Sequence, residues 1–323
     1  MSAEKAIIEF YKQFEYEPVI ENAENLQSKE KWIICGMGGS HLAADLLKIF
    51  QPRLEIIIHF DYGLPEMSAE DLNQYLIIAS SYSGNTEETL DSFGEALKKK
   101  LSLAAISVGG KLLESAKKNS IPFVQLPDTG IQPRFALGFS LRAILKLMGD
   151  KKNLAETQKL ARLLDNQFCQ KAGHELAQKI KGCVPVIYAS RKNKAIAYNW
   201  KIKFNETAKI PAFYNIFPEL NHNEMTGFDA KETTKSLSDK FYFIFLLDSG
   251  DHPRILKRMD LTSELLKKRG YKVEILELAG QNSWHKIFSN LLIADWTTYY
   301  TALNYGTEPE FVPMVEEFKK LMQ

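Results

Sequence analysis

Residues 75–89 read YLIIASSYSGNTEET. The aliphatic run at the start is typical of a strand buried in a parallel sheet, and the pattern over Glu87–Lys100 is that of a covering helix. Between them, the hydroxyls of Ser81, Ser83 and Thr86 and the free N–H groups of the helix start suit a dianionic phosphate ester. Ordinary N-capping by Thr86 is the alternative, but a cap needs one hydroxyl and not a cluster. The loop therefore predicts phosphate binding.

A second loop of this kind lies earlier in the chain, where residues 36–40 read GMGGS. Glycines here let the backbone turn sharply and approach a ligand, which makes Gly38, Gly39 and Ser40 candidate contacts. The spacing departs from the dinucleotide pattern GxGxxG, since His41 follows directly, and a plain strand-to-helix turn is the alternative. Both loops follow neighbouring strands of one parallel sheet, so we expect them to face the same crevice.

Short apolar runs alternate with helical patterns along most of the chain. This alternation predicts an α/β fold with a doubly wound parallel sheet flanked by helices, and it occurs twice. The polar segment Asp150–Asn153 predicts a boundary between domains at 1–152 and 153–323, followed by a helix over Leu154–Lys181. The expected strands are Trp32–Cys35, Leu54–His59, Tyr75–Ala79, Leu103–Val108, Pro122–Leu126, Val184–Tyr188, Phe241–Leu247 and Lys272–Leu276. The other expected helices are His41–Phe50, Lys111–Asn119, Ala136–Gly149, Asn193–Thr207, Arg254–Arg269, Trp284–Tyr305 and Pro313–Met322.

Composition narrows the class of protein. The chain has 323 residues, is 45% hydrophobic and 25% charged, and has a formal net charge of +1. Such a balance gives no global attraction to nucleic acid or an anionic membrane, and no apolar run approaches the roughly 20 residues that cross a bilayer. Three scattered cysteines, Cys35, Cys169 and Cys183, indicate reduced thiols and a cytoplasmic location. Neither cysteines nor histidines form a ligand pattern, so we expect no metal and no cofactor.

Further motifs lie outside the two loops. Residues 132–138 read QPRFALG, residues 199–212 read NWKIKFNETAKIPA, and residues 217–224 read FPELNHNE. SYSGNTEET by itself resembles the phosphate loop of sugar isomerase (SIS) domains, which occur in enzymes and regulators alike. All the motifs together resemble the bifunctional phosphoglucose/phosphomannose isomerase family, from about Trp32 to Lys319. The resemblance implies two SIS domains and interconversion of glucose 6-phosphate, and possibly mannose 6-phosphate, with fructose 6-phosphate.

The resemblance also implies roles for four residues. Glu206 would be the base that moves a proton through a cis-enediol, and Arg134 would stabilise the developing enediolate. His222 and Lys319 would assist ring opening, His222 by reaching the partner's active site in a homodimer. Without the resemblance, Glu206 is an ordinary helix carboxylate, Arg134 a structural ion pair and Lys319 part of an exposed lysine helix. Lys320 leaves the register of the lysine open by one residue.

Two departures from the family pattern bear on substrate preference. Residues 41–44, HLAA, follow the first loop where relatives commonly have small residues, so an imidazole could narrow the pocket or add a contact. Residues 308–311, EPEF, stand where many relatives have Asp-Pro-Thr-Pro. We therefore expect glucose 6-phosphate to be the better aldose. A non-catalytic phosphosugar sensor and an amino-sugar phosphate isomerase or deaminase are the competing hypotheses; the resemblance to an isomerase also implies a place in glycolysis or gluconeogenesis.

Overall fold

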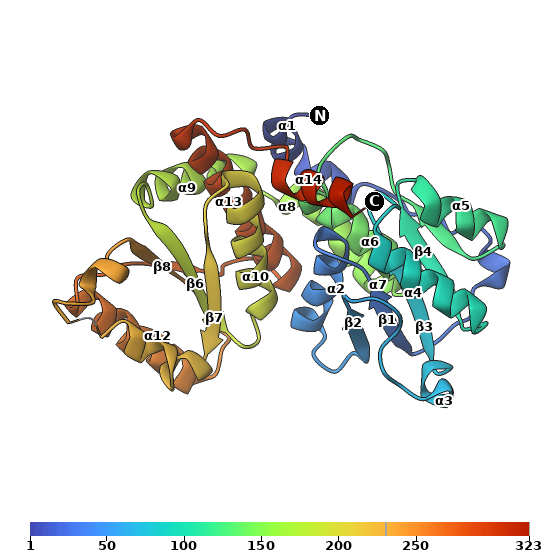
Figure 1. Ribbon diagram of the computed structural model, residues 1–323, viewed down its shortest axis with the longest axis horizontal. Helices are drawn as coiled ribbons and strands as arrows, with labels where there is room; N and C mark the ends of the chain where they lie inside the picture. Colours follow the sequence, from blue (N-terminus) through green and yellow to red (C-terminus); the bar gives the residue numbers. More distant parts are fainter. Residues whose placement is uncertain (230, 323) are drawn as a thin grey trace. The chain divides into compact units, whose positions relative to one another are not determined.

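The chain divides into two compact units, Met1–Leu164 and Asp165–Gln323 (Figure 1). The computed structural model describes residues 1–229 and 231–322. The division lies beyond the boundary expected after residue 152, because the intervening helices pack with the first unit. Arg142 is fully buried there and donates through Nη1 to Leu154 O at 2.9 Å and to Thr157 Oγ1 at 3.2 Å. The polar segment is therefore a turn within the first unit.

The sheet of the first unit has the order β2-β1-β3-β4-β5, and every pair of neighbours is parallel. All five strands expected in this half of the chain are present. Their short aliphatic sequences form the buried middle layer of the unit (Figure 1). The strands are β1 (Lys31–Cys35), β2 (Ile56–His59), β3 (Tyr75–Ser80), β4 (Leu103–Ser107) and β5 (Phe123–Gln125).

Helices cover both faces of this sheet. On one face, Ile33, Ile77 and Ala105 pack with Phe93 of α4 and Leu112 of α5. Helices α2 and α6 pack together on the other face, so the sheet is doubly wound. The helices of this unit are α1 (Ala3–Ile8), α2 (Gly39–Phe50), α3 (Ala69–Leu72), α4 (Glu87–Lys98), α5 (Gly110–Lys118), α6 (Leu137–Leu147), α7 (Lys151–Gln158) and α8 (Leu160–Leu163). Three 3₁₀ turns complete it: η1 (Phe10–Phe14), η2 (Ala23–Asn25) and η3 (Pro133–Phe135).

The helix expected over Leu154–Lys181 is interrupted. It comprises α7, α8 and, in the second unit, α9 (Asn166–Lys179). Asp165 is the cause, because its Oδ1 accepts the N–H of Phe168 at 2.9 Å and so caps a new helix. The prediction of one continuous helix was wrong at this residue.

The second unit contains a four-stranded parallel sheet of order β7-β6-β8-β9. The expected strands β6 (Val184–Ser190), β8 (Phe241–Leu247) and β9 (Lys272–Glu277) are present. Strand β7 (Phe213–Phe217) was not foreseen. It lies at the sheet edge, where Phe213 is 54% exposed, so it lacks the continuous apolar sequence of a central strand.

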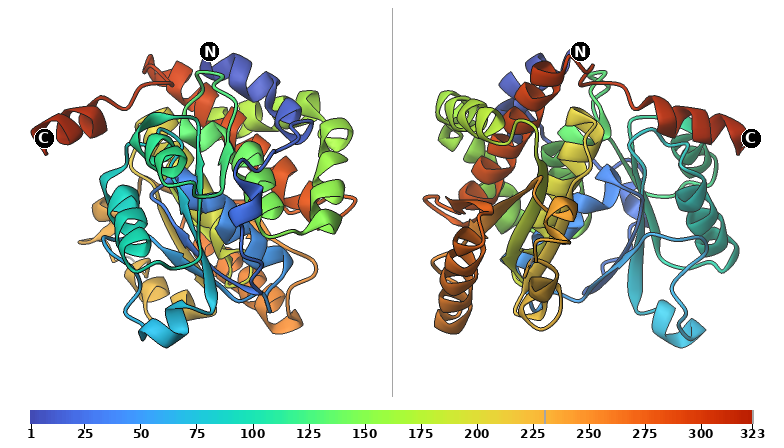
Figure 2. Two further views of the ribbon diagram at one scale, coloured as in Figure 1. Left: turned by 90° about the vertical axis from the view of Figure 1, so that its right-hand side faces the viewer. Right: turned by 60° about the vertical axis from the view of Figure 1, so that its left-hand side comes forward.

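An aromatic core fills one face of the second sheet. Tyr188 of β6 lies 5.4 Å, between ring centroids, from both Phe243 and Phe245 of β8, and Met259 of α12 packs against this group. Helices α9, α10 and α13 lie on the other face (Figures 1 and 2). The helices are α10 (Lys194–Lys203), α11 (Glu224–Gly227), α12 (Pro253–Lys268), α13 (Ser283–Tyr305) and α14 (Pro313–Leu321), with a π turn η4 (Phe204–Ala208) and 3₁₀ turns η5 (Glu219–Asn221) and η6 (Lys235–Leu237).

The two sheets follow one plan. In each, the first strand lies between the second and the third, so the order reverses between the first and third strands. This reversal falls between β1 and β3 in the first unit and between β6 and β8 in the second. Ligands of doubly wound sheets bind at such a point, beyond the carboxyl ends of the strands. The predicted α/β fold with two doubly wound parallel sheets is confirmed.

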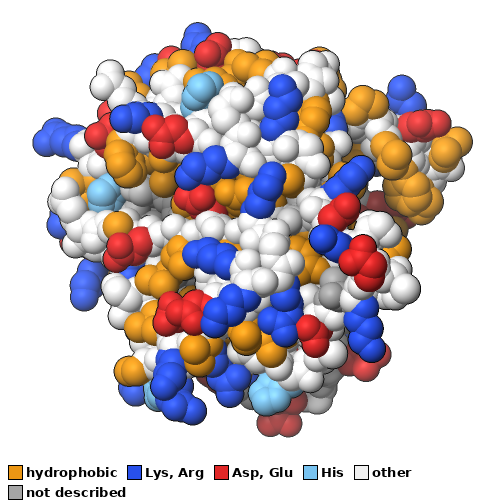
Figure 3. Space-filling view, turned by 90° about the vertical axis from the view of Figure 1, so that its left-hand side faces the viewer, with side chains coloured by type: hydrophobic (Ala, Val, Ile, Leu, Met, Phe, Trp, Pro, Cys, Tyr) orange, Lys and Arg blue, Asp and Glu red, His pale blue; other side chains and the backbone are white. Residues whose placement is uncertain are grey.

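Two further properties concern the length and polarity of the helices and the distribution of charged side chains on the surface. Over residues 1–229 and 231–322, every helix is too short or too polar to cross a membrane. On the face drawn in Figure 3, basic and acidic side chains are intermixed, in keeping with the net charge of +1.

Candidate active site

Two loops of the first unit meet at its strand-order reversal, as expected. Ser40, in the first turn of α2, accepts the N–H of Tyr82 through Oγ at 3.0 Å, and its carbonyl accepts the hydroxyl of Ser80 at 2.9 Å. A Cβ on Gly36 would lie 2.6 Å from Ser80 O, so this close approach requires glycine. The loops after β1 and β3 therefore form one surface.

The loop after β3 presents hydroxyls of two kinds. Ser81 is fully buried, and its Oγ accepts the N–H of Gly84 at 3.1 Å and lies 2.8 Å from Thr86 Oγ1. Ser83 is exposed and Thr86 is half-buried. Thr86 stands at the N-cap position of α4 but makes no side-chain cap bond, contrary to the simple capping interpretation. Ser81 thus lies inside the loop. Ser83 and Thr86 are more accessible, and each oxygen has one local hydrogen bond, from Asn85 N to Ser83 Oγ at 3.2 Å and between Thr86 Oγ1 and Ser81.

Gly84 makes this loop possible. It has φ of +72°, and a Cβ there would lie 1.8 Å from Gly109 O. Any other residue would have to displace the backbone that follows β4. Gly84 thus determines the loop conformation that positions the hydroxyls beyond the end of β3.

His41 follows the first loop and is 5% exposed. Its Nδ1 lies 2.6 Å from Asp45 Oδ2, and its ring stacks on Phe60 at 5.6 Å between centroids. The imidazole is thus held by its own helix and a neighbouring aromatic ring. Phe60 is 61% exposed, so this stacked pair borders solvent.

Arg134 lies in η3 against the first loop. Its side chain is 2% exposed, and its guanidinium carbon lies 4.8 Å from the centroid of the Phe135 ring. A Cβ on Gly39 would lie 2.9 Å from the backbone carbon of Pro133, so the turn carrying Arg134 packs directly on the glycine loop. The fold therefore joins Arg134 and the two loops in one unit.

Glu206 lies in the second unit, in the π turn that continues α10. It is half-buried, and its carbonyl accepts Lys209 Nζ at 2.9 Å. Before it, the fully buried Lys203 pairs with Asp295 of α13 at 2.5 Å. Single π turns inside helices are frequent at functional sites. The expected helix ends in this turn, which no sequence pattern had indicated.

The segment 219–224, ELNHNE, is fastened at two sides. Asn221 donates to Thr262 Oγ1 of α12 at 2.8 Å and accepts from Arg258 at 3.3 Å. Glu224 accepts the hydroxyl of Tyr188 at 2.5 Å and the side-chain amide of Asn215. These bonds account for two of the polar residues of the motif, Asn221 and Glu224.

His222 stands exposed between these two attachments. Its backbone N–H donates to Glu219 O at 2.9 Å, and its ring makes no hydrogen bond to residues 1–229 or 231–322. Burial, and the neighbouring Glu224 carboxylate, raise the pKa of Tyr188 well above its ordinary value, so Tyr188 remains a neutral donor. The segment therefore presents the His222 imidazole at the surface, where a ligand or a partner can reach it.

Lys319 lies on α14, where it is 61% exposed and pairs with Glu316 at 2.8 Å. Within the part of the chain that the structure describes, it makes no hydrogen bond to Glu206 or His222. Lys320 is exposed on the same helix. The expected grouping of this lysine with the other candidates is therefore not seen in the single chain.

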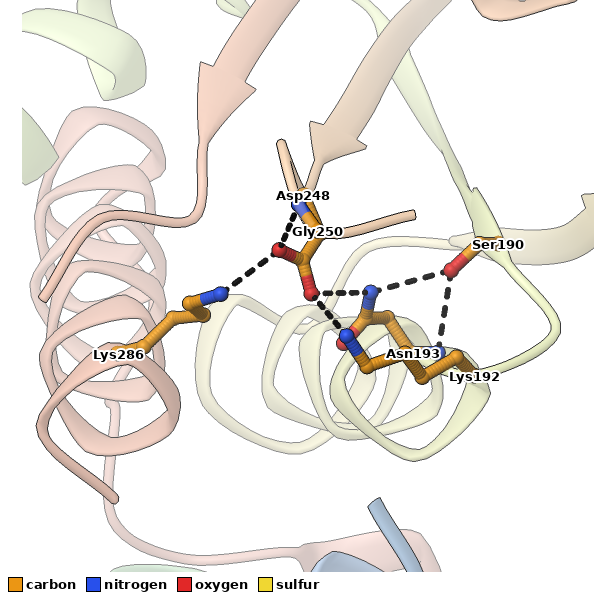
Figure 4. Close-up of polar contacts among 6 residues, drawn as sticks. All are labelled: Ser190, Lys192, Asn193, Asp248, Gly250 and Lys286. Carbon is orange, nitrogen blue, oxygen red and sulfur yellow. Dashed lines mark hydrogen bonds and ion pairs between the residues drawn. The ribbon is translucent and has the colours of Figure 1, made fainter. Parts of the chain in front are cut away.

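A polar cluster not foreseen from the sequence lies at the strand-order reversal of the second unit (Figure 4). Asp248 follows β8 and is 1% exposed. Its Oδ1 accepts Lys286 Nζ at 2.7 Å and Gly250 N at 3.0 Å, and its Oδ2 accepts Lys192 Nζ at 2.9 Å and Asn193 Nδ2 at 3.2 Å. The one available sequence signal was Asp248 itself, directly after an apolar strand.

The electrostatics of this cluster follow from its contacts. Burial by itself would raise the pKa of Asp248, but hydrogen bonds from Lys286, Lys192, Gly250 and Asn193 outweigh it and hold that pKa well below the usual range. The neighbouring Asp251 behaves oppositely, because burial and the Asp248 charge raise its pKa. Among residues 1–229 and 231–322, no three His, Cys, Asp or Glu side chains are grouped to hold a metal ion.

Comparison with known proteins agrees with this architecture. Two doubly wound parallel units, the first carrying a hydroxyl-rich loop, are the architecture of the SIS class. Residues 169–322 match the family described as the bacterial phospho-glucose isomerase C-terminal SIS domain. The solved C-terminal domain of glucosamine-fructose-6-phosphate aminotransferase from Francisella tularensis has the same fold, with a TM-score of 0.69, 15% identity, and coverage of 96% of this chain and 98% of that one.

Curated relatives identify the family more specifically than the fold does. The bifunctional phosphoglucose/phosphomannose isomerase of Aquifex aeolicus is 34% identical over 320 residues, covering 98% of this chain and 97% of the relative. The protein of that name from Caldicellulosiruptor bescii is 34% identical over 307 residues, covering 90% and 88%. The chain belongs to the bifunctional phosphoglucose/phosphomannose isomerase family.

Proposed function

We propose that this protein is an aldose–ketose isomerase that interconverts glucose 6-phosphate or mannose 6-phosphate with fructose 6-phosphate. The observation that carries the proposal is the placement of Glu206. It is a half-buried carboxylate on a π turn, braced by the buried Lys203–Asp295 pair, in a chain that belongs to an isomerase family. A single carboxylate held in this way can take a proton from one carbon and return it to the next.

In the proposed reaction, Ser83, Thr86 and the free amides of α4 bind the phosphate group, with Gly38, Gly39 and Ser40 alongside. Ser81, which is buried, shapes the loop instead. A proton moves from the anomeric hydroxyl to the ring oxygen to open the sugar, with His222 and Lys319 as donor and acceptor. No resident metal or cofactor enters these steps.

The open-chain aldose then passes through a cis-enediol. Glu206 removes the proton on C2, the electron pair of that C–H bond forms the C1–C2 double bond, and the π pair of the C1 carbonyl moves onto O1. The hydroxyl proton of O2 then passes to O1, the C2 carbonyl forms, and the electron pair of the C1–C2 double bond takes the proton back from the same carboxyl group at C1. Arg134 stabilises the oxygen charge that develops between these steps, because a guanidinium attracts an enediolate more strongly than a neutral sugar. Fructose 6-phosphate results without net loss of atoms.

We also propose a homodimer in which His222 serves the partner's active site. Two observations support it: His222 is exposed, and helix α14 has no buried residue among those described. Its exposed side chains include Met314 at 82%, Phe318 at 61% and Leu321 at 80%, an apolar stripe with helical spacing. Burial of this apolar stripe by a second copy of the chain would also bring Lys319 to the dimer interface.

Two narrower expectations remain predictions. Glu308 accepts the N–H groups of Glu310 and Phe311 and so closes a turn in the segment where the family pattern is Asp-Pro-Thr-Pro, with Glu310 at the place of the threonine. A preference for glucose 6-phosphate follows from that difference. A cytoplasmic location is expected from the free cysteines, of which Cys35 and Cys169 are buried with pKa values raised by burial to about 12.

A substrate panel tests the proposed activity. The purified protein, freed of metal by a chelator, is incubated with fructose 6-phosphate, both aldose 6-phosphates and glucosamine 6-phosphate. Formation of glucose 6-phosphate from fructose 6-phosphate is expected. Ammonia release from glucosamine 6-phosphate would identify a deaminase instead. Phosphosugar-dependent thermal stabilisation without turnover would identify a sensor.

A further inference from the structure

The two units differ at the strand-order reversal of their sheets. In the first, the loops after β1 and β3 are joined by the bond from Tyr82 N to Ser40 Oγ, and Ser83 and Thr86 remain accessible. In the second, the corresponding loops follow β6 and β8. They are joined through the carboxylate of Asp248, which lies between them (Figure 4).

Asp248 has the surroundings of a bound anion. Two ammonium groups, one backbone N–H and one side-chain amide donate to its two oxygens, at 2.7 to 3.2 Å. The donors come from three places: Lys192 and Asn193 after β6, Gly250 after β8, and Lys286 in the first turns of α13. Convergence of such donors from separate elements is what a phosphate group requires.

The charges of the cluster balance. Lys192 and Lys286 supply two positive charges, and Asp248 with Asp251 supplies two negative ones. Asp251 is 9% exposed, and its Oδ2 has no hydrogen-bond partner among the described residues. Removal of the Asp248 carboxylate would leave four converging donors and a net positive charge. Such an arrangement favours an anion.

We propose that Asp248 is a built-in anion that occupies the phosphate position of the second unit. The second unit is thereby closed to phosphate groups, and the first unit alone binds the phosphate group of the substrate. Truncation of Asp248 would uncover a second site for inorganic phosphate. This inference concerns the phosphate position of the second unit and does not depend on the proposed isomerase chemistry.

The test counts phosphate bound per chain by isothermal titration of the full-length protein. Asp248→Ser is expected to bind one more equivalent of inorganic phosphate than the wild type, whatever number the wild type binds. Asp248→Ser/Lys286→Met should lose that extra equivalent. Asp260→Ser, which removes an exposed carboxylate from α12, is the matched control and should bind as the wild type does.

Thermal unfolding provides a readout if Asp248→Ser is unstable. Phosphate should raise its Tm by about 5 °C more than it raises the wild-type Tm, because a ligand of the native state alone stabilises it. In the wild type, phosphate should leave the acetylation rates of Lys192 and Lys286 unchanged. The proposal is overturned if phosphate protects those two lysines in the wild type, or if it neither binds additionally to Asp248→Ser nor restores its fold.

Discussion

Tyr188 and Glu224 are joined by a 2.5 Å hydrogen bond that fastens the His222 segment to the central strand of the second sheet. Tyr188 belongs to the aromatic core and is 1% exposed, so the donor is fixed. The accepting carboxylate lies two residues from His222. This bond therefore ties the chain segment that carries the exposed His222 to the buried core.

Loss of this bond should lower the activity without unfolding the protein. Tyr188→Phe keeps the aromatic ring and removes the hydroxyl, and loss of a hydrogen bond to a charged group costs roughly 1.5–3 kcal/mol. We expect kcat to fall by about tenfold or more with little change in KM. In a His222→Ala background, the same substitution should have almost no further effect on the low residual kcat, measured at high enzyme concentration, since both act through one imidazole. Equal losses in both backgrounds would show that Tyr188 acts elsewhere.

The phosphate loop should fail when Gly84 acquires a side chain. Gly84→Ala places a Cβ against Gly109 O in a backbone conformation of positive φ, so the loop must move. We expect KM for fructose 6-phosphate to rise by at least about tenfold, the effect of losing roughly 1.4 kcal/mol of binding.

Gly94→Ala is a matched control within the next helix. A Cβ there meets open space, and replacing a helical glycine by alanine stabilises by about 0.5–1 kcal/mol. Its KM should equal that of the wild type. An unchanged KM in Gly84→Ala would show that this loop is not part of the binding site.

The Asp248 cluster predicts a specific pH dependence of stability. The pKa of Asp248 is lowered in the folded protein, so its contribution is complete above the unfolded pKa of about 3.9 and is lost as the pH falls below it. Asp251, facing the same lysines, has a raised pKa and acts with the opposite sign. Asp248→Asn should cost about 1–3 kcal/mol at pH 7.

Urea unfolding at several pH values measures this dependence. The difference in free energy of unfolding between the wild type and Asp248→Asn should be largest between pH 6 and 7 and should shrink below about pH 4. Asp260→Asn, on the exposed surface, should show no such trend. A constant difference from pH 3 to 7 would mean that the Asp248 charge is not what stabilises the cluster.

The shared active site predicts complementation between inactive variants. Glu206→Gln and His222→Ala proteins are mixed under conditions that allow subunit exchange. A mixed dimer then has one site lacking both residues and one site with neither lost, so activity should return. Mixed dimers that are verified by mass and remain inactive would contradict sharing of His222 across an interface.

Most strands could be predicted because their sequences are continuous aliphatic or aromatic runs, which suits strands buried on both faces. Strand β7 escaped prediction because residues 213–217, FYNIF, lie half-exposed at an edge. The helix ending at Thr207 was expected, but its π turn depends on packing against α13, which no local pattern records.

The candidate site was predicted unevenly for a similar reason. The glycine and serine loops were recognisable because each lies between a strand and a helix, so that its conformation is determined by residues that are close in the sequence. The Asp248 cluster joins residues from 192 to 286, and such long-range contacts leave no periodic signal. The roles of Glu206, His222, Lys319 and Arg134 rest on family resemblance and remain to be measured.

One assay tests the central claim most directly. Glucose 6-phosphate formation from fructose 6-phosphate is followed by a coupled enzyme, using chelator-treated wild type, Glu206→Gln and the exposed control Glu264→Gln. We predict turnover by the wild type and the control, and a loss of at least about a hundredfold in kcat for Glu206→Gln, the contribution of a general base. Wild-type rates in Glu206→Gln, or no turnover by any of the three, would contradict the account.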